Sequence, residues 1–176
     1  FIRHWKEHAR STLHPLLEAY QSGMEIGDLE FAAIAIYVYS SLSFFTGKPL
    51  AKLEQEMASY SEVLARIKQQ RALYMNGLYR QVVLNLMGKS DKPFLLNGAS
   101  YDEDKMLPLH LEANDRTAIY YVCFNKLILC YLFQEYTQAV EYATMAERYA
   151  KSAVGSLSIV IFHFYDSLAR LATYTQ

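Results

Sequence analysis

Apolar side chains recur along most of this chain at intervals of three and four residues, which places them on one face of an α-helix. The clearest stripe follows Pro49 and consists of Leu50, Leu53, Met57, Tyr60, Leu64 and Ile67. No segment sustains the alternation of apolar and polar residues that is typical of a half-buried strand. The pattern therefore predicts an all-α fold.

Capping and turn residues divide this pattern into about eight helices. Asp28 and Asp115 are suited to the N-cap, while Gly47 and Gly88 are suited to the residue that follows a helix. We expect helices from near the N-terminus to residue 24, then over 29–46, 49–67 and 73–87, then from 102, and finally over 116–133, 137–151 and 156–173. The longest loop should cover residues 89–101.

A weak internal repeat relates two parts of the chain at an interval of 87 residues. Asp28 and Asp115 open similar apolar stretches, and Leu42 and Leu129 are identical at the same interval. This interval holds two units of about 43 residues, within the range of helical-hairpin arrays, and short connections between long helices favour antiparallel hairpins. We therefore predict a tetratricopeptide-like array of αα-hairpins, wound as a right-handed superhelix, in a single domain over residues 1–176.

The expected hairpin over residues 116–151 fits this type of repeat best. Its second helix carries small residues at the spacing that lets two helices approach closely, namely Ala139, Ala143 and Ala146. Its first helix carries Cys123 and Cys130, which are separated by about 10.5 Å of helix and therefore lie beyond disulfide reach. We expect both cysteines to pack in the core as free thiols, which favours a reducing, cytoplasmic setting.

Composition excludes several classes of partner. The chain has 176 residues, of which 52% are hydrophobic, and a net charge of −1, so nothing in the overall balance attracts nucleic acid or an anionic membrane. No apolar run approaches the roughly 20 residues of a membrane-spanning helix, and no secretory signal pattern is present. Because the sequence starts at Phe1 without Met, we expect a fragment of a longer protein.

Two short motifs suggest chemistry but lack the residues that the chemistry needs. The segment 88–90 resembles the end of a phosphate-binding loop, but Val83 stands where that loop requires glycine, and the preceding segment is helical. His4 and His8 have the spacing of two metal ligands on a helix, without the residue order of a known zinc motif. We therefore expect no catalytic residue, cofactor or metal ion, and no enzyme activity.

The aromatic content indicates a binding surface. The chain has 15 Tyr and 9 Phe, and tyrosine is favoured at interfaces because it combines an apolar ring with a polar tip. In tetratricopeptide register, the groove-facing positions of two first helices are Tyr37, Ser41, Phe44, Tyr121, Phe124 and Tyr131. The alternative, that these side chains pack between neighbouring repeats, stays open.

Several segments together resemble the helical-repeat region of large bacterial multidomain signalling kinases. They are residues 27–32, 53–57, 79–86, 114–118 and 162–169, and the resemblance covers roughly residues 10–172. Such proteins join a serine/threonine-kinase-like domain, a signalling ATPase, this helical region, a GAF sensor and often a histidine kinase. The resemblance implies a non-catalytic arm between the ATPase and the output domains, and it carries over no catalytic residue.

These observations favour a protein–protein interaction or regulatory module of a signal-transduction kinase. Its partners would be other domains of the same polypeptide or a signalling protein. The alternative function is a small-ligand sensor that binds its ligand in the aromatic-lined groove. Near-continuous apolar residues over 159–164 leave the last helix in need of further cover, so we also expect a homodimer that forms through terminal helices.

Overall fold

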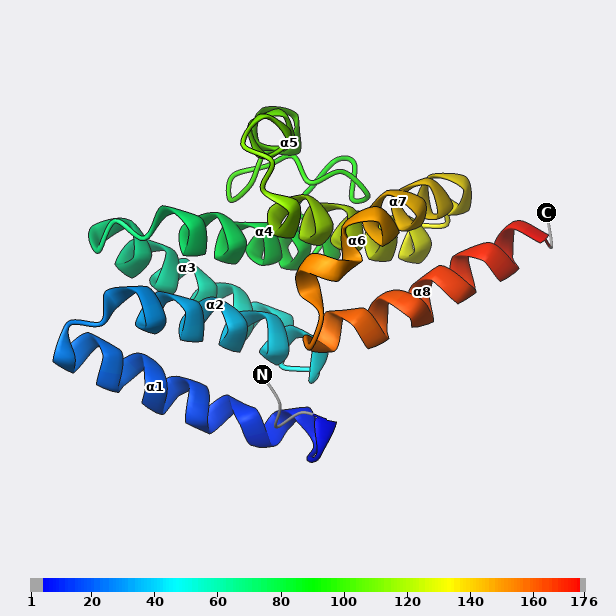
Figure 1. Cartoon of the computed structure of the whole chain (residues 1–176). Helices are drawn as coiled ribbons and strands as arrows, with labels where there is room; N and C mark the ends of the chain where they lie inside the picture. Colours follow the sequence, from blue (N-terminus) through cyan, green and yellow to red (C-terminus); the bar gives the residue numbers. More distant parts are fainter. Residues whose placement is uncertain (1–4, 175–176) are drawn as a thin grey trace. The chain divides into compact units, whose positions relative to one another are not determined.

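A computed structural model describes residues 5–174 of the chain, which fold into eight α-helices and two short 3-10 helices (Figure 1). The described residues contain no strand, only one isolated bridge between Asn97 and Asp102. The prediction of an all-α fold is confirmed. The chain divides into two compact units, Phe1–Met87 and Gly88–Gln176, which are described separately. The single tetratricopeptide-like array remains a prediction.

The first unit is built from four helices of 14 to 17 residues after the short helix η2 (Ala9–Thr12). They are α1 (Leu13–Ile26), α2 (Leu29–Phe45), α3 (Leu50–Arg66) and α4 (Gln70–Leu86). Helix α1 packs along α2, α3 packs along α4, and α2 also contacts α3 and α4. The core of this unit is formed by buried Ala33, Ile36, Tyr39, Leu64 and Ala72.

Glycine permits the close approach of α1 to α2. A Cβ atom on Gly23 would lie only 2.9 Å from Cβ of Ala32, a distance that real Cβ contacts do not show. The connection between the two helices then turns at Gly27, whose φ of 81° is costly for residues with a side chain. Asp28 caps α2 by accepting a hydrogen bond from the backbone N–H of Phe31.

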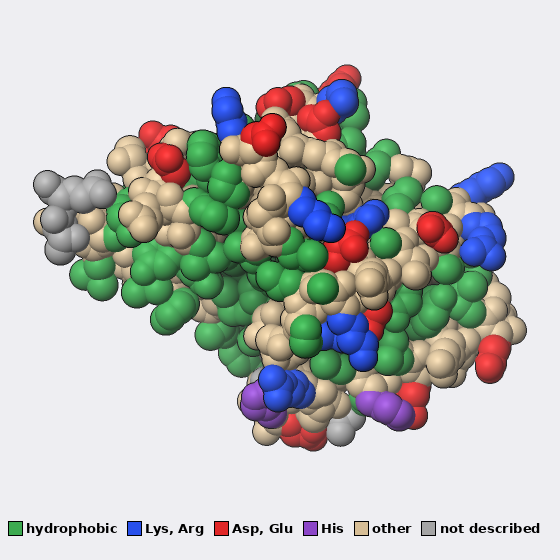
Figure 2. Space-filling view, turned by 180° about the vertical axis from the view of Figure 1, so that it is seen from behind, with side chains coloured by type: hydrophobic (Ala, Val, Ile, Leu, Met, Phe, Trp, Pro, Cys, Tyr) green, Lys and Arg blue, Asp and Glu red, His purple; other side chains and the backbone are tan. Residues whose placement is uncertain are grey.

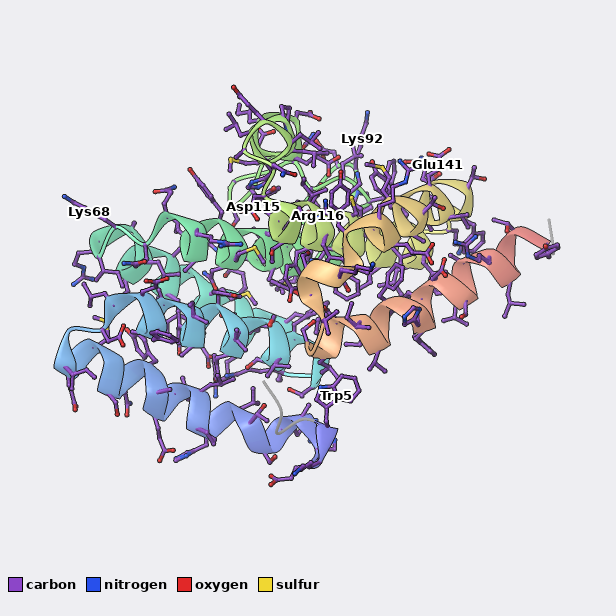
Figure 3. The ribbon with its side chains drawn as sticks, in the orientation of Figure 1. Trp5, Lys68, Lys92, Asp115, Arg116 and Glu141 are labelled. Carbon is purple, nitrogen blue, oxygen red and sulfur yellow. The ribbon has the colours of Figure 1, made fainter. Side chains whose placement is uncertain are left out.

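The break between α3 and α4 lies within the expected interval, but α4 begins at Gln70, three residues earlier than the sequence pattern indicates. The reason is Lys68, which adopts a φ of 56° and reverses the chain within three residues. Figure 3 shows the side chain of Lys68 pointing away from this turn into solvent. Lysine rarely adopts the left-handed backbone conformation, so its presence at position 68 does not indicate a turn.

The second unit begins with the loop over residues 88–101 and contains the other four α-helices. They are α5 (Glu103–Glu112), α6 (Arg116–Leu132), α7 (Tyr136–Tyr149) and α8 (Leu157–Tyr174), with the short helix η3 (Ala150–Ala153) before α8. Helix α6 contacts α5, α7 and α8, and α7 also contacts α8. The expected inward positions are fully buried, as confirmed for Cys123, Leu127, Cys130, Ala139, Ala143 and Ala146.

Contacts at its start fix α6 within this unit. Figure 3 labels Asp115 and Arg116 at the start of the helix. Asp115 caps the helix by accepting from the backbone N–H of Ala118 at 3.1 Å. Arg116 donates from Nη2 to the carbonyl oxygen of Arg148 at 3.2 Å, and its guanidinium lies 5.3 Å from the ring centroid of Tyr149. The start of α6 is therefore tied to the end of α7.

The interval of 87 residues recurs in the structure. Helices α2 and α6 both have 17 residues and begin 87 positions apart, each with an Asp cap. Positive φ values precede them at Gly27 and Asn114, and follow them at Gly47 and Gln134. Helices α4 and α8 also begin 87 positions apart. The same order of four helices thus occurs in each unit.

Candidate functional site

Three of the aromatic-groove positions lie in the first unit, along α2. Tyr37, Ser41 and Phe44 are all partly buried. Tyr37 packs against the core of this unit, and the hydroxyl of Ser41 donates to the carbonyl oxygen of Val38 at 2.9 Å. The ring of Phe44 lies 5.0 Å from that of Phe45. The three side chains therefore follow one another along the helix at its partly exposed side.

The other three positions lie along α6 in the second unit. Phe124 is fully buried and stacks on Tyr120, with ring centroids 5.8 Å apart. The ring of Tyr131 lies 5.7 Å from the ring of Tyr136 on α7 and 5.7 Å from the ring of Tyr165 on α8. Tyr121 stays partly exposed. Phe124 and Tyr131 thus take part in helix packing, and a groove shared by all six positions remains a prediction.

The most exposed apolar surface of the second unit lies on α8. We define the outer face of α8 as Val160, Phe164, Ser167, Leu171 and Tyr174. The exposed fractions of the four large side chains are 48% for Val160, 58% for Phe164, 63% for Leu171 and 89% for Tyr174. The opposite side of α8 carries buried Ser158, Phe162 and Ala169, and the helix contacts α6 and α7. Figure 2 shows hydrophobic side chains gathered along α8, at the left of the view.

A polar edge runs beside the outer face of α8. Arg170 Nε lies 2.7 Å from Asp166 Oδ1, an ion pair between residues four apart on the helix. His163 is exposed one turn before this pair. At helical spacing of 100° per residue, His163 and Arg170 both lie on the same flank of the apolar stripe. The outer face therefore combines an apolar centre with a charged border, as protein interfaces do.

A buried ion pair in the second unit is the feature that the sequence analysis missed. Lys126 of α6 has a side chain that is 1% exposed, and its Nζ lies 2.7 Å from Oε1 of Glu103. The same ammonium lies 4.8 Å from the ring centroid of Tyr142 on α7. Glu103 Oε2 accepts from the backbone N–H of Leu96 at 2.9 Å. One lysine thus joins α6, α7, the start of α5 and the loop before it.

A sign of this pair is present in the sequence. Lys126 interrupts the apolar pattern of α6 between two inward-facing cysteines, on the buried side of the helix. A buried ammonium is costly unless it is paired and hydrogen-bonded. The position of Lys126 could therefore have indicated a partner carboxylate, although the sequence does not tell which one.

The groups around this ion pair are held in their neutral forms. Burial raises the pKa of the Cys123 thiol to about 12 and that of Cys130 to about 11, so neither forms a thiolate near neutral pH. His110 Nε2 lies 3.1 Å from the hydroxyl of Tyr101. Burial lowers the pKa of His110, partly offset by Asp115. These groups are suited to packing rather than to nucleophilic chemistry.

A second polar cluster joins α2 to α3 in the first unit. Lys48 donates to the hydroxyl of Tyr39 at 2.7 Å and forms an ion pair with Glu56, and Tyr39 donates to Glu56 at 3.3 Å. Burial alone would lower the pKa of Lys48, but its hydrogen bonds to Glu56 and Tyr39 outweigh burial and raise it. The cluster fixes the turn after α2.

Neither a metal-binding cluster nor a membrane-spanning helix is present in the described part of the chain. Residues 5–174 hold no group of three or more His, Cys, Asp or Glu side chains that could bind a metal ion. His4 of the expected histidine pair lies outside the described residues. None of the helices between residues 5 and 174 combines the length and apolar character that crossing a bilayer requires.

Comparison of the sequence with known protein families, with curated proteins and with solved structures finds no match.

Proposed function

We propose that this chain is a non-catalytic protein-interaction module that docks through the outer face of α8. The observation that carries the proposal is the row of four large apolar side chains there, each close to half exposed or more. Contiguous apolar patches on an otherwise polar surface mark sites where another protein binds. The opposite side of α8 is anchored on α6 and α7, so the exposed row is held on a fixed helix.

The resemblance to signalling kinases suggests where such a module would act. It would serve as a cytoplasmic regulatory arm whose partner is another domain of the same polypeptide, the signalling ATPase first of all. With a net charge of −1, the chain offers little long-range electrostatic attraction, so recognition would rest on the apolar centre of the face. Binding of this kind is expected to be moderate in affinity and reversible.

The proposal is tested by isothermal titration calorimetry of this chain with the signalling ATPase domain that the resemblance implies for the same polypeptide. We expect micromolar binding that weakens at least tenfold with Phe164→Asp, because the variant places a charge in the centre of the apolar row. Leu109→Asp is the matched control, since Leu109 is 53% exposed but lies on α5.

Two results would count against the proposal. One is the absence of binding at high micromolar concentration when circular dichroism shows both proteins to be folded. The other is equal weakening by Phe164→Asp and Leu109→Asp, which would mean that binding does not use the outer face of α8.

A further inference from the structure

We propose that the outer face of α8 binds a second copy of this chain, with the two α8 helices antiparallel and crossing at Ser167. The inference goes beyond the proposed function, because it gives the same surface a second occupant. Three properties of α8 support it: the spacing of the apolar residues, their order along the helix, and the placement of one ion pair.

The spacing of the outer face is that of a helix–helix seam. Successive members lie four, three, four and three residues apart, from Val160 to Tyr174. This is the a/d pattern of a coiled coil, in which apolar residues every 3.5 positions stay in line along a partner helix. A seam of this kind fits another long helix better than it fits a small molecule or an extended peptide.

The positions along the seam are spaced nearly symmetrically about its middle. Ser167 stands at the middle, with Phe164 and Leu171 next to it and Val160 and Tyr174 at the ends. A two-fold axis at Ser167 brings Phe164 of each copy against Leu171 of the other, and Val160 against Tyr174. Such an interface is isologous, so the same surface completes itself on both copies. The small serine lets the helices approach at their crossing.

A parallel pair would use the same residues less well. It would set Phe164 against Phe164 and Tyr174 against Tyr174, while Val160 met only Val160. Large side chains would then crowd at two levels of the seam and leave a gap at a third. Interleaving of large and small side chains is what gives a helix pair its packing density. The sequence of sizes on α8 therefore favours the antiparallel pair.

The ion pair on the flank of the seam gives the same orientation. A two-fold axis perpendicular to the helices keeps equivalent flanks on the same side, so Arg170 of one copy lies beside Asp166 of the other. Their levels along the helix differ by two residues, or about 3 Å, which both side chains can span. In a parallel pair, equivalent flanks lie on opposite sides of the seam, so Arg170 of one copy would lie away from Asp166 of the other. Opposite charges at the border select the orientation of an interface more than they add affinity.

The size of the seam sets the strength of the dimer. Each copy contributes one helix with four large apolar side chains, less than the interfaces of about 1,200–2,000 Å² found in stable complexes. We therefore expect a reversible dimer that dissociates in the micromolar range.

Sedimentation equilibrium of the whole chain tests the self-association. From about 2 to 200 µM, we expect the mean mass to rise from that of one chain towards twice that value. Phe164→Asp and Leu171→Lys should each remain monomeric, while Leu109→Asp on α5 should dimerise as the wild-type chain does. Far-UV circular dichroism verifies that each variant is folded. A wild-type chain that stays monomeric over this range overturns the proposal.

Cysteine cross-linking tests the orientation. Val160→Cys and Tyr174→Cys are prepared as separate proteins, mixed and oxidised. The antiparallel pair predicts disulfides mainly between the two different variants, because equivalent positions lie about 20 Å apart across the two-fold axis. The native Cys123 and Cys130 are fully buried and do not compete. Cross-links that join mainly identical variants would exclude the antiparallel pair.

The two proposals can fail separately. A chain that remains monomeric, but still binds the ATPase domain in a manner that Phe164→Asp weakens, overturns the self-pairing and keeps the proposed function. If the chain dimerises through α8 and does not bind the ATPase domain, the self-pairing is supported and the proposed regulatory function is overturned.

Discussion

Lys126 illustrates how a charged side chain is held inside a helical unit. Its ammonium is fully enclosed, with the carboxylate of Glu103 on one side and the ring of Tyr142 on another. The two attractive contacts compensate for the lost hydration of the charge. Because Glu103 also binds the backbone of Leu96, the pair holds the loop before α5 against the rest of the unit.

Replacing Lys126 by methionine should destabilise the chain by about 3 kcal/mol, because it leaves the Glu103 carboxylate without its partner in a largely buried position. The double variant Lys126→Met with Glu103→Gln should recover much of this loss, since no unpaired charge remains. Urea unfolding followed by circular dichroism measures both. Lys151→Met, at an exposed lysine, is the control, and an equal loss for Lys151→Met would show that the ion pair has no special role.

His110 makes the stability of the second unit depend on pH. Its folded-state pKa is lowered by burial, so the folded chain holds it neutral where the unfolded chain already binds a proton. This contribution to stability is present above the ordinary histidine pKa of about 6.5 and is lost as pH falls below it.

We therefore expect the free energy of unfolding to fall as the pH drops below about 6.5, and to fall less steeply in His110→Gln. Urea unfolding at half-unit intervals of pH, at low protein concentration, measures the slope. His163→Gln, at an exposed histidine, serves as the control. Identical slopes for His110→Gln and the wild-type chain would contradict the assignment.

At the scale of helices, the caps explain why the sequence predicts most boundaries. Asp28 and Asp115 each accept a backbone N–H three residues ahead, and both mark the starts of their helices correctly. Glycine marks the ends at Gly47 and Gly88, where φ is positive. The start of α4 could not be located in the same way. Lys68 adopts a left-handed backbone conformation in the turn before it, and lysine is not a residue type that indicates such a turn.

Gln134 occupies the position after α6 that Gly47 occupies after α2, and it adopts a φ of 66°. A left-handed conformation is strained for a residue with a Cβ atom, so Gln134→Gly should stabilise the chain by about 0.5–1 kcal/mol. Gln134→Ala keeps the Cβ atom and should bring no such gain. Thermal unfolding of the three proteins measures the difference, and equal gains from Gly and Ala would show that the backbone strain is not the cause.

At the scale of the whole molecule, helix number and inward positions follow from the sequence, while the polar contacts do not. Apolar periodicity identifies the buried cysteines and alanines of α6 and α7, because burial of a helix face needs only the right spacing. The pairing of Lys126 with Glu103 depends on the position of α5, which follows a long loop. The spacing of residues along the chain does not indicate that position. The exposed row on α8 is likewise visible only once its opposite side is buried.

Because the chain is nearly neutral, its self-association should depend little on salt concentration. With a net charge of −1, two copies repel each other little, and the seam of α8 is apolar at its centre. Raising the salt concentration from about 0.05 to 0.5 M should therefore change the dimer dissociation constant less than about threefold.

Arg170→Glu would place like charges along the shared flank, since Asp166 faces the same side in both copies. Its dimer should be weak at low salt and recover at high salt, measured by sedimentation equilibrium. Salt-independent behaviour of Arg170→Glu would place this flank outside the interface.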